Sequence, residues 1–151
     1  MESKIIGIDE ANRMLPLLRQ IVHDIMSHWE KIIQKRTQLE CMEKGVDPSG
    51  KGGAPKGHTG ELAQSLKFEL NYLIDKINNY IREVEELGCF VEEFKRGIVN
   101  FPSLYNGRKV FLCWKPEEPT VSHWHELDET YNDRVPIRDA REFLVQKPEV
   151  R

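Results

Sequence analysis

The chain has 151 residues, of which 39% are hydrophobic and 31% are charged, and its formal net charge at pH 7 is −3. This length suits a single domain, residues 1–151, with a hydrophobic core of its own. The slightly acidic balance disfavours nucleic acid and anionic membranes as partners, because both require a basic face on the protein.

The opening segment and the cysteines indicate a cytoplasmic protein. The first residues, MESKIIGIDEANRM, contain no basic stretch followed by an apolar run. No segment approaches the roughly 20 apolar residues of a membrane span. The three cysteines, Cys41, Cys89 and Cys113, lie far apart and form no CxxC pair. This spacing argues against a disulfide framework and against a zinc site made of cysteines alone.

Residues 8–44 carry a long helical pattern. Asp9 is the predicted N-cap, and Pro16 predicts a kink in the first turns or a helix that begins near it. Apolar residues recur at spacings of three, four and seven along this segment, which indicates a packing face: Leu15, Leu18, Val22, Ile25, Trp29, Ile32 and Leu39.

Residues 45–59 are rich in glycine and proline and predict a flexible loop. The stretch GVDPSGKG matches the first part of a phosphate-binding loop. However, Lys51 is followed by Gly52 in place of the serine or threonine that binds magnesium, and a helix precedes it in place of a strand. We therefore interpret this segment as a connector between helices.

Residues 60–87 predict a second long helix, and Gly88 follows at the position where a positive φ often ends a helix. Two long helices joined by a flexible loop favour an antiparallel hairpin. The apolar seam of the second helix alternates spacings of four and three, the pattern of paired helices: Leu66, Leu70, Leu73, Ile77, Tyr80, Val84 and Leu87.

Residues 98–125 predict a small antiparallel sheet. The segments 98–104 and 108–114 are rich in β-branched and aromatic residues, and Asn106-Gly107 between them is a strong hairpin-turn signal. Pro102 suits an edge position or a bulge, and residues 120–124 could add a third strand. In the C-terminal segment, residues 126–151, we expect a short helix over 139–145. The predicted fold class is α+β, a long antiparallel helical hairpin packed with a small antiparallel sheet.

The stretch from Arg96 to Pro136 resembles an uncharacterised prokaryotic family, domain of unknown function 2203. The resemblance lies in RGIVNFPSLYNGRKVFLCW and HWHELDETYNDRVP, with a Trp-His-x-x-Asp element followed by Arg-x-Pro, and in LPLL of the first helix. After Asp128 the family usually has a small residue and glycine, whereas this chain has Glu129, Thr130 and Asn132. The resemblance implies family membership and no established activity.

The sequence HWHELD suggests a metal site. On a strand, His123 and His125 point to one face and Trp124 to the other. Two imidazoles can share a divalent transition metal ion, with zinc or iron as the main candidates, and Asp128 could ligate the ion or orient His125. A further ligand would come from a helix, where the candidates are His23, His28 and Glu69. HELDE lacks the second histidine of the zinc-protease pattern HExxH.

Two other interpretations of this stretch remain open. In the first, the histidines are packed and hydrogen-bonded, with Asp128 satisfying the second nitrogen of His125. In the second, His125 and Asp128 form a general base, and nearby cations bind a small carboxylate or phosphate. Arg108, Arg134 and Trp124 are the expected contacts of such a ligand, with Arg96 and Lys109 nearby, although such arginines often pair with surface acids such as Glu117 and Glu118. Whether the protein is an enzyme stays undecided.

The helical seams carry a further expectation. Two long apolar stripes exceed what one small sheet covers, so we predict a homodimer, with a monomer as the alternative. The leading functional hypothesis is a small metal-binding protein that uses His123, His125 and Asp128. The alternative is a helical module that docks another protein. In either case Cys113 is expected to be a small, inert buried residue.

Overall fold

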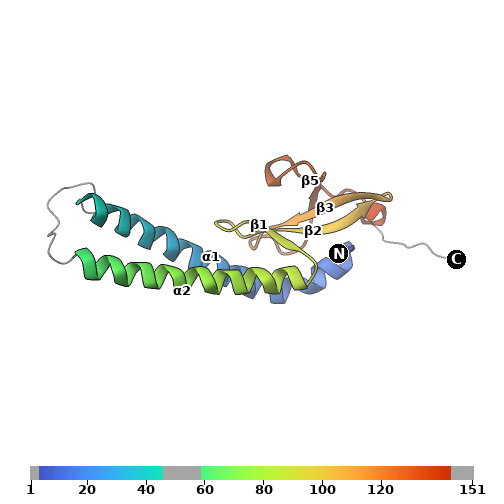
Figure 1. The fold of residues 1–151 in the computed structure, drawn as a ribbon. Coiled ribbons are helices and arrows are strands. Elements are labelled where there is room, and N and C mark those ends of the chain that lie inside the picture. Colours follow the sequence, from blue (N-terminus) through green and yellow to red (C-terminus); the bar gives the residue numbers. More distant parts are fainter. Residues whose placement is uncertain (1–3, 46–58, 144–151) are drawn as a thin grey trace.

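The structure is a computed structural model that describes residues 4–45 and 59–143. Two long helices form an antiparallel hairpin, and a five-stranded sheet follows them in the chain (Figure 1). This arrangement confirms the α+β prediction. The elements are α1 (Ile8–Lys44), α2 (Thr59–Glu86), β1 (Phe90–Glu93), β2 (Ile98–Tyr105), β3 (Arg108–Trp114), β4 (His123–His125), the 3-10 turn η2 (Tyr131–Asp133), β5 (Val135–Pro136) and the 3-10 turn η3 (Ala140–Phe143).

The first helix follows the prediction in its bounds and departs from it at its start. Gly7 is the N-cap, so the prediction of Asp9 was wrong, and Asp9 lies in the first turn, where its charge suits the helix dipole. The helix begins at Ile8 and continues through Pro16. It ends at Gly45, whose φ of 75° is left-handed. The predicted flexible loop falls almost wholly on residues 46–58, which lie outside the described residues.

The sheet is a meander in which each strand pairs antiparallel with the next, in the order β1-β2-β3-β4-β5. The predicted turn is confirmed: Asn106 and Gly107 both have positive φ, and Tyr105 pairs with Arg108. Pro102 lies beyond the residues of β2 that pair with β1, which agrees with an edge position. The sequence prediction missed β1 and β5, and it extended β4 too far towards its N-terminus.

One face of the sheet packs on the helices. Alternate residues of β2 and β3 point to that face and belong to the same apolar cluster as Leu18 and Val22 of α1. Four of these strand residues are fully buried: Val99, Phe101, Leu112 and Trp114. At Gly97 the turn between β1 and β2 approaches α1 so closely that a Cβ would lie 2.4 Å from Val22 Cγ1. Glycine is therefore required there for space as well as for its φ of 69°.

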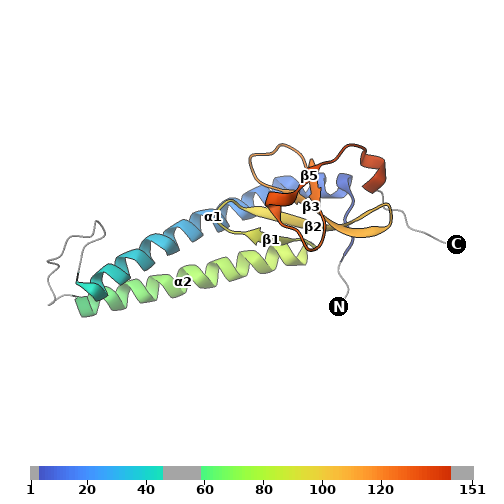
Figure 2. The same ribbon diagram turned by 90° about the horizontal axis from the view of Figure 1, so that it is seen from above.

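The opposite face of the sheet is covered by the chain after β4. Figures 1 and 2 show this segment, with η2 and β5, on the side of the sheet away from the helices. Beneath it lie polar and charged side chains. Three of them are almost fully buried, with exposed fractions of 3%, 0% and 1% respectively: Asn100, Cys113 and His125.

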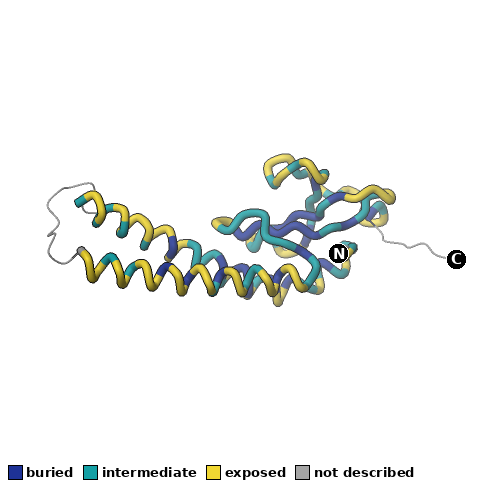
Figure 3. Tube along the Cα trace, in the orientation of Figure 1, coloured by how far each residue is buried: buried dark blue, intermediate teal, exposed yellow. Residues whose placement is uncertain are grey.

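The hairpin extends well beyond the sheet. Its distant half contains a second, smaller apolar cluster, in which four residues are buried: Ile32, Leu70, Leu73 and Ile77. Among the described residues, none of 33–45 or 60–69 is buried, as the yellow and teal of Figure 3 show. In the part of the chain that the structure describes, neither helix is long and apolar enough to cross a lipid bilayer.

Candidate metal centre

A row of polar side chains crosses the covered face of the sheet. Asn100 of β2 lies opposite Cys113 of β3, which in turn lies opposite His123 of β4. Two residues further along these strands, Phe111 of β3 lies opposite His125. Their rings meet edge to face, with centroids 5.8 Å apart. Directly opposite residues share a face, so both histidines lie on the covered face, as the alternation predicted.

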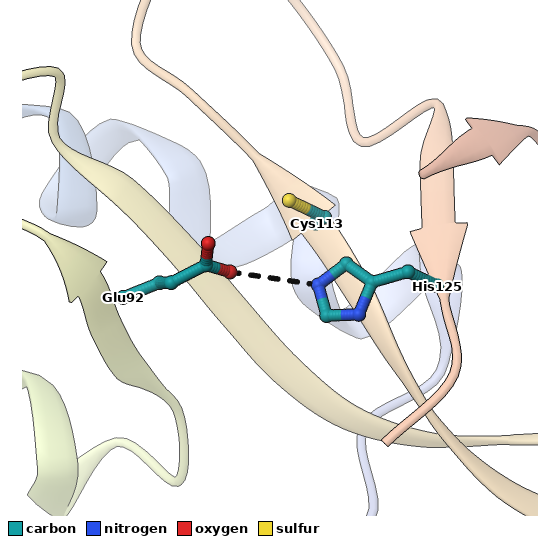
Figure 4. Close-up of side chains that lie close together, drawn as sticks. All are labelled: Glu92, Cys113 and His125. Carbon is teal, nitrogen blue, oxygen red and sulfur yellow. Dashed lines mark ion pairs between the residues drawn. The ribbon is translucent and has the colours of Figure 1, made fainter. Parts of the chain in front are cut away.

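Three potential ligands from three strands meet on this face (Figure 4). One oxygen of Glu92, the sulfur of Cys113 and one nitrogen of His125 all lie within 4.8 Å of one another. Among the described residues this is the group of histidine, cysteine and acidic side chains that could hold a metal ion. Its members differ in exposure, because the side chain of Glu92 is 21% exposed and that of His125 is 0% exposed.

A β-bulge places Glu92 in this group. Val91 pairs with Val99, but Ile98 pairs with Glu93, which leaves Glu92 as the extra residue of β1. Such a bulge bends the strand and redirects a side chain. The carboxylate is then held by two donors, the side-chain amide of Asn100 at 2.8 Å and the backbone N–H of Tyr131 at 3.0 Å.

The hydrogen bonds of His125 determine which of its ring nitrogens carries a proton. Nδ1 lies 2.8 Å from the carbonyl oxygen of Glu126, and a carbonyl only accepts, so Nδ1 carries a proton. Nε2 faces the amide oxygen of Asn100 at 3.2 Å and the Glu92 carboxylate at 3.6 Å. Asn100 cannot rotate this oxygen away, because its nitrogen already donates to Glu92. Nε2 therefore faces two acceptors, the amide oxygen of Asn100 and the carboxylate of Glu92.

The electrostatic surroundings of Cys113 oppose ionisation of its thiol. Burial raises the pKa of Cys113 to about 12, against the opposing influence of nearby Arg134. Arg134 itself forms an ion pair with Glu118, and its guanidinium lies 3.4 Å from the Cys113 carbonyl oxygen. Burial is the largest influence on the pKa of Glu118 and raises it. The hydrogen bonds from Arg134 and from the backbone of Lys115, together with the positive charge of Arg134, outweigh burial, so the pKa is lowered.

His123 belongs to a neighbouring contact network. Its Nδ1 lies 2.9 Å from the hydroxyl of Ser122 and 3.9 Å from the carboxylate of Glu118. Burial lowers the pKa of His123, and the positive charge of Arg134 lowers it further. The structure therefore separates the two histidines of the HWH sequence: His125 joins Glu92 and Cys113, and His123 joins Glu118.

The other residues expected at a metal site lie elsewhere. Asp128 is exposed. The ring nitrogens of His125 have other partners, because Nδ1 contacts the Glu126 carbonyl oxygen and Nε2 contacts the Asn100 amide oxygen. Pairing of His125 with Asp128, either as a packed ring or as a general base, was therefore wrong. Of the helical candidates, His28 contacts the Asp24 carbonyl and Glu69 pairs with Lys35. Neither these nor His23 belongs to the group.

The residues expected to bind an anion are dispersed. Arg108 pairs with Glu126, and Arg134 pairs with Glu118 as the alternative interpretation had it. Trp124 packs in the core on the opposite face, stacked on Tyr105 with ring centroids 4.5 Å apart. These three side chains do not line one site.

Sequence reasoning missed Glu92 and dismissed Cys113. Residues 90–93 were not interpreted as a strand, although two residues suited to strands, Phe90 and Val91, follow soon after Gly88, which ends the helical hairpin. Cys113 was expected to be a small, inert buried residue, and it is fully buried, on the face of the sheet opposite Leu112 and Trp114. Its place in this group follows only from the pairing register of β3 with β2 and β4, which sets Cys113 between Asn100 and His123.

The fold and this group of side chains define a small α+β protein in which one sulfur, one nitrogen and one oxygen atom that could hold a metal ion lie close together. The chain belongs to the family described as an uncharacterized conserved protein, DUF2203, whose model matches residues 4–137. That range covers both helices, all five strands and the three residues of this group. No curated protein and no solved structure matches the chain significantly.

Proposed function

We propose that the protein binds a divalent transition metal ion through Glu92, Cys113 and His125. The observation that carries this proposal is the convergence of acceptor atoms around Nε2 of His125. A neutral ring would direct its lone pair at the amide oxygen of Asn100, which is unfavourable in a buried site. A cation between these atoms would turn that repulsion into attraction.

The chemistry of the donors favours zinc. Zinc accepts thiolate, imidazole and carboxylate together, and three protein ligands leave a position for water or another group. The hydrogen bond from Nδ1 of His125 to a backbone carbonyl is the orienting contact that metal-bound histidines usually make. Iron remains a second candidate, but the thiol argues for the softer metal.

The competing state is an imidazolium ion. If no metal binds, a doubly protonated His125 could donate to the Glu126 carbonyl and to Asn100, with Glu92 as its counter-ion. This state and the metal-bound state make opposite predictions for metal uptake, so one experiment separates them.

The test is metal analysis of protein purified without a histidine tag, followed by titration with Zn²⁺ and Co²⁺. We expect one ion per chain, with a cobalt–thiolate absorption band in the near ultraviolet. Cys113→Ala should abolish that band and lower Zn²⁺ affinity by about 100-fold or more, because loss of a ligand exceeds the usual effect of its orienting partners. The matched control is Cys89→Ala, which removes an equally buried thiol on the helix side. An absence of uptake by the wild-type chain would refute the proposal.

Two further variants identify the ligand set. His123 and Asp128, the ligands that the sequence pattern suggested with His125, form the alternative set. We expect Glu92→Gln to weaken Zn²⁺ binding strongly and Asp128→Asn to leave it unchanged. The reverse result would assign the ion to the alternative set.

A second candidate function is self-association through α2. Phe68 and Tyr72 lie one turn apart on this helix and are 76% and 58% exposed. In a two-fold dimer the same patch serves both subunits, so this aromatic pair could meet its own copy. Sedimentation equilibrium should then show a dimer that Phe68→Glu dissociates. Leu17→Glu, at an exposed apolar position of α1, is the control. A monomeric wild-type protein would end this proposal.

A further inference from the structure

Three cationic side chains surround the ring of Tyr131. The guanidinium carbons of Arg134 and Arg96 lie 4.1 and 4.7 Å from the ring centroid, and the ammonium nitrogen of Lys115 lies 5.3 Å from it. They come from three separate segments: the turn between β1 and β2, the residue after β3, and the residue after η2. A single cation on a ring is common, but three converge here.

The positive charge at this place is only partly neutralised. Arg134 pairs with Glu118, and both side chains are largely buried. Arg96 pairs with Glu93 at 2.7 Å and is exposed. Among the described residues, Lys115 has no carboxylate oxygen within ion-pair distance, and its contact is with Tyr131. The cluster therefore presents to solvent one exposed arginine and one lysine that is in no ion pair, with Glu117 and Glu118 nearby.

This cluster adjoins the candidate metal centre. The backbone N–H of Tyr131 donates to the Glu92 carboxylate, and Lys115 follows Cys113 by two residues, just beyond the end of β3. Glu92 is also the most exposed of the three candidate ligands. Through its hydrogen bond to Glu92, the segment that carries Tyr131 is therefore in direct contact with the candidate centre.

We propose that Arg96, Lys115 and Tyr131 bind a small oxyanion, of the phosphate or carboxylate class, at the open position of the ion held by Glu92, Cys113 and His125. The inference rests on the proposed metal site. A divalent ion is neutralised by one carboxylate and one thiolate, so a bound anion adds a negative charge that needs nearby cations. Lys115 and Arg96 supply this positive charge, and both offer N–H donors to the oxygens of the anion, which only accept.

The experiment uses full-length Co²⁺-loaded protein, whose visible spectrum responds to a change of ligand at the ion. Inorganic phosphate and acetate are titrated separately, with chloride at matched ionic strength as the control. We expect a saturable spectral change with at least one of the two oxyanions, and the stronger response identifies the class. Lys115→Gln and Arg96→Gln should each weaken binding by about tenfold, the usual order for a hydrogen bond to a charged group.

Two control variants make the result specific. Lys95→Gln removes an exposed cation beside Arg96 that does not face Tyr131, and it should leave the affinity unchanged. Lys115→Arg keeps the charge and should retain most of the binding, which separates a lost contact from a damaged fold.

The outcomes distinguish this inference from the metal proposal. Protein that takes up Co²⁺ but responds to neither anion overturns the oxyanion site and leaves the metal site standing. Equal phosphate affinity in metal-free protein, or an equal loss in Lys95→Gln, also overturns it. A failure to take up Co²⁺ overturns both proposals.

Discussion

Both faces of the sheet contain fully buried residues, but the chemical surroundings of those residues are opposite. On the helix side, Phe101 and Leu112 are fully buried among apolar side chains. On the covered side, Cys113 and His125 are as deeply buried, but they sit among groups that donate, accept or carry charge. Burial therefore does not distinguish core from site in this protein. The two faces differ in the chemical groups that surround their buried residues.

The largest expected effect compares neighbouring residues of β3 that point to opposite faces. Leu112→Ala should lower the free energy of unfolding by about 2–5 kcal/mol, with or without Zn²⁺, because it leaves a cavity in the core. Cys113→Ala should cost about 1 kcal/mol in metal-free protein. It should also remove the added stability, about 2.7 kcal/mol at a Zn²⁺ concentration 100 times the Kd, that the ion gives the wild-type chain. Urea unfolding with and without Zn²⁺ measures both.

If Cys113→Ala kept the full stabilisation by Zn²⁺, the two faces would differ in polarity alone. The ion would then have to bind elsewhere.

The contact between the sheet and α1 can be broken at Gly97. Gly97→Ala should lower the free energy of unfolding by about 3 kcal/mol, because its Cβ would lie 2.4 Å from Val22 and 2.8 Å from Met26. Gly107→Ala is the matched control. It has a similar positive φ of 85° but open space around it, so only backbone strain of about 1 kcal/mol remains. Thermal unfolding of both variants separates steric from conformational cost, and equal losses would contradict the close approach.

The ion pair between Arg134 and Glu118 tests how well the covered side of the sheet excludes water. Arg134→Gln should lower the free energy of unfolding by about 2 kcal/mol, since it leaves the partly buried Glu118 carboxylate without its main partner. Arg141→Gln removes the exposed partner of Asp139 and should change stability little. Chemical denaturation of the two variants gives the contrast, and equal effects would show that the covered side is open to water.

The smallest expected effect is a pH dependence from His123. Its folded-state pKa lies below the ordinary 6.5, chiefly because of burial. Above pH 6.5 the ring is neutral in both states and contributes nothing. As the pH falls below 6.5, the unfolded chain takes up a proton that the folded protein resists, so stability declines. His123→Gln should flatten this part of the profile of melting temperature against pH. An unchanged slope would assign the decline to other groups.

The sequence predicted the fold better than the site, for physical reasons. The helical hairpin follows from apolar periodicity and the turn at Asn106 from local backbone preference, and both are encoded within a few residues. The site depends on register and on an irregularity. His125 was recognised from the HxH spacing, but Glu92 enters through a bulge in a four-residue strand, and Cys113 through the pairing of β3 with β2 and β4. Spacing along the chain carries no information about these contacts.

The division of the hairpin into two apolar clusters has a consequence for local unfolding. Among the described residues, the cluster at the sheet contains most of the buried apolar side chains, whereas the distant one holds Ile32, Leu70, Leu73 and Ile77. Backbone amides in the distant half can therefore open, and exchange their hydrogens with solvent, at a much lower free energy than those of β2 and β3. The long helices are continuous in shape but act as two units in stability, so the outer half can fray while the strands that carry Glu92, Cys113 and His125 stay in register.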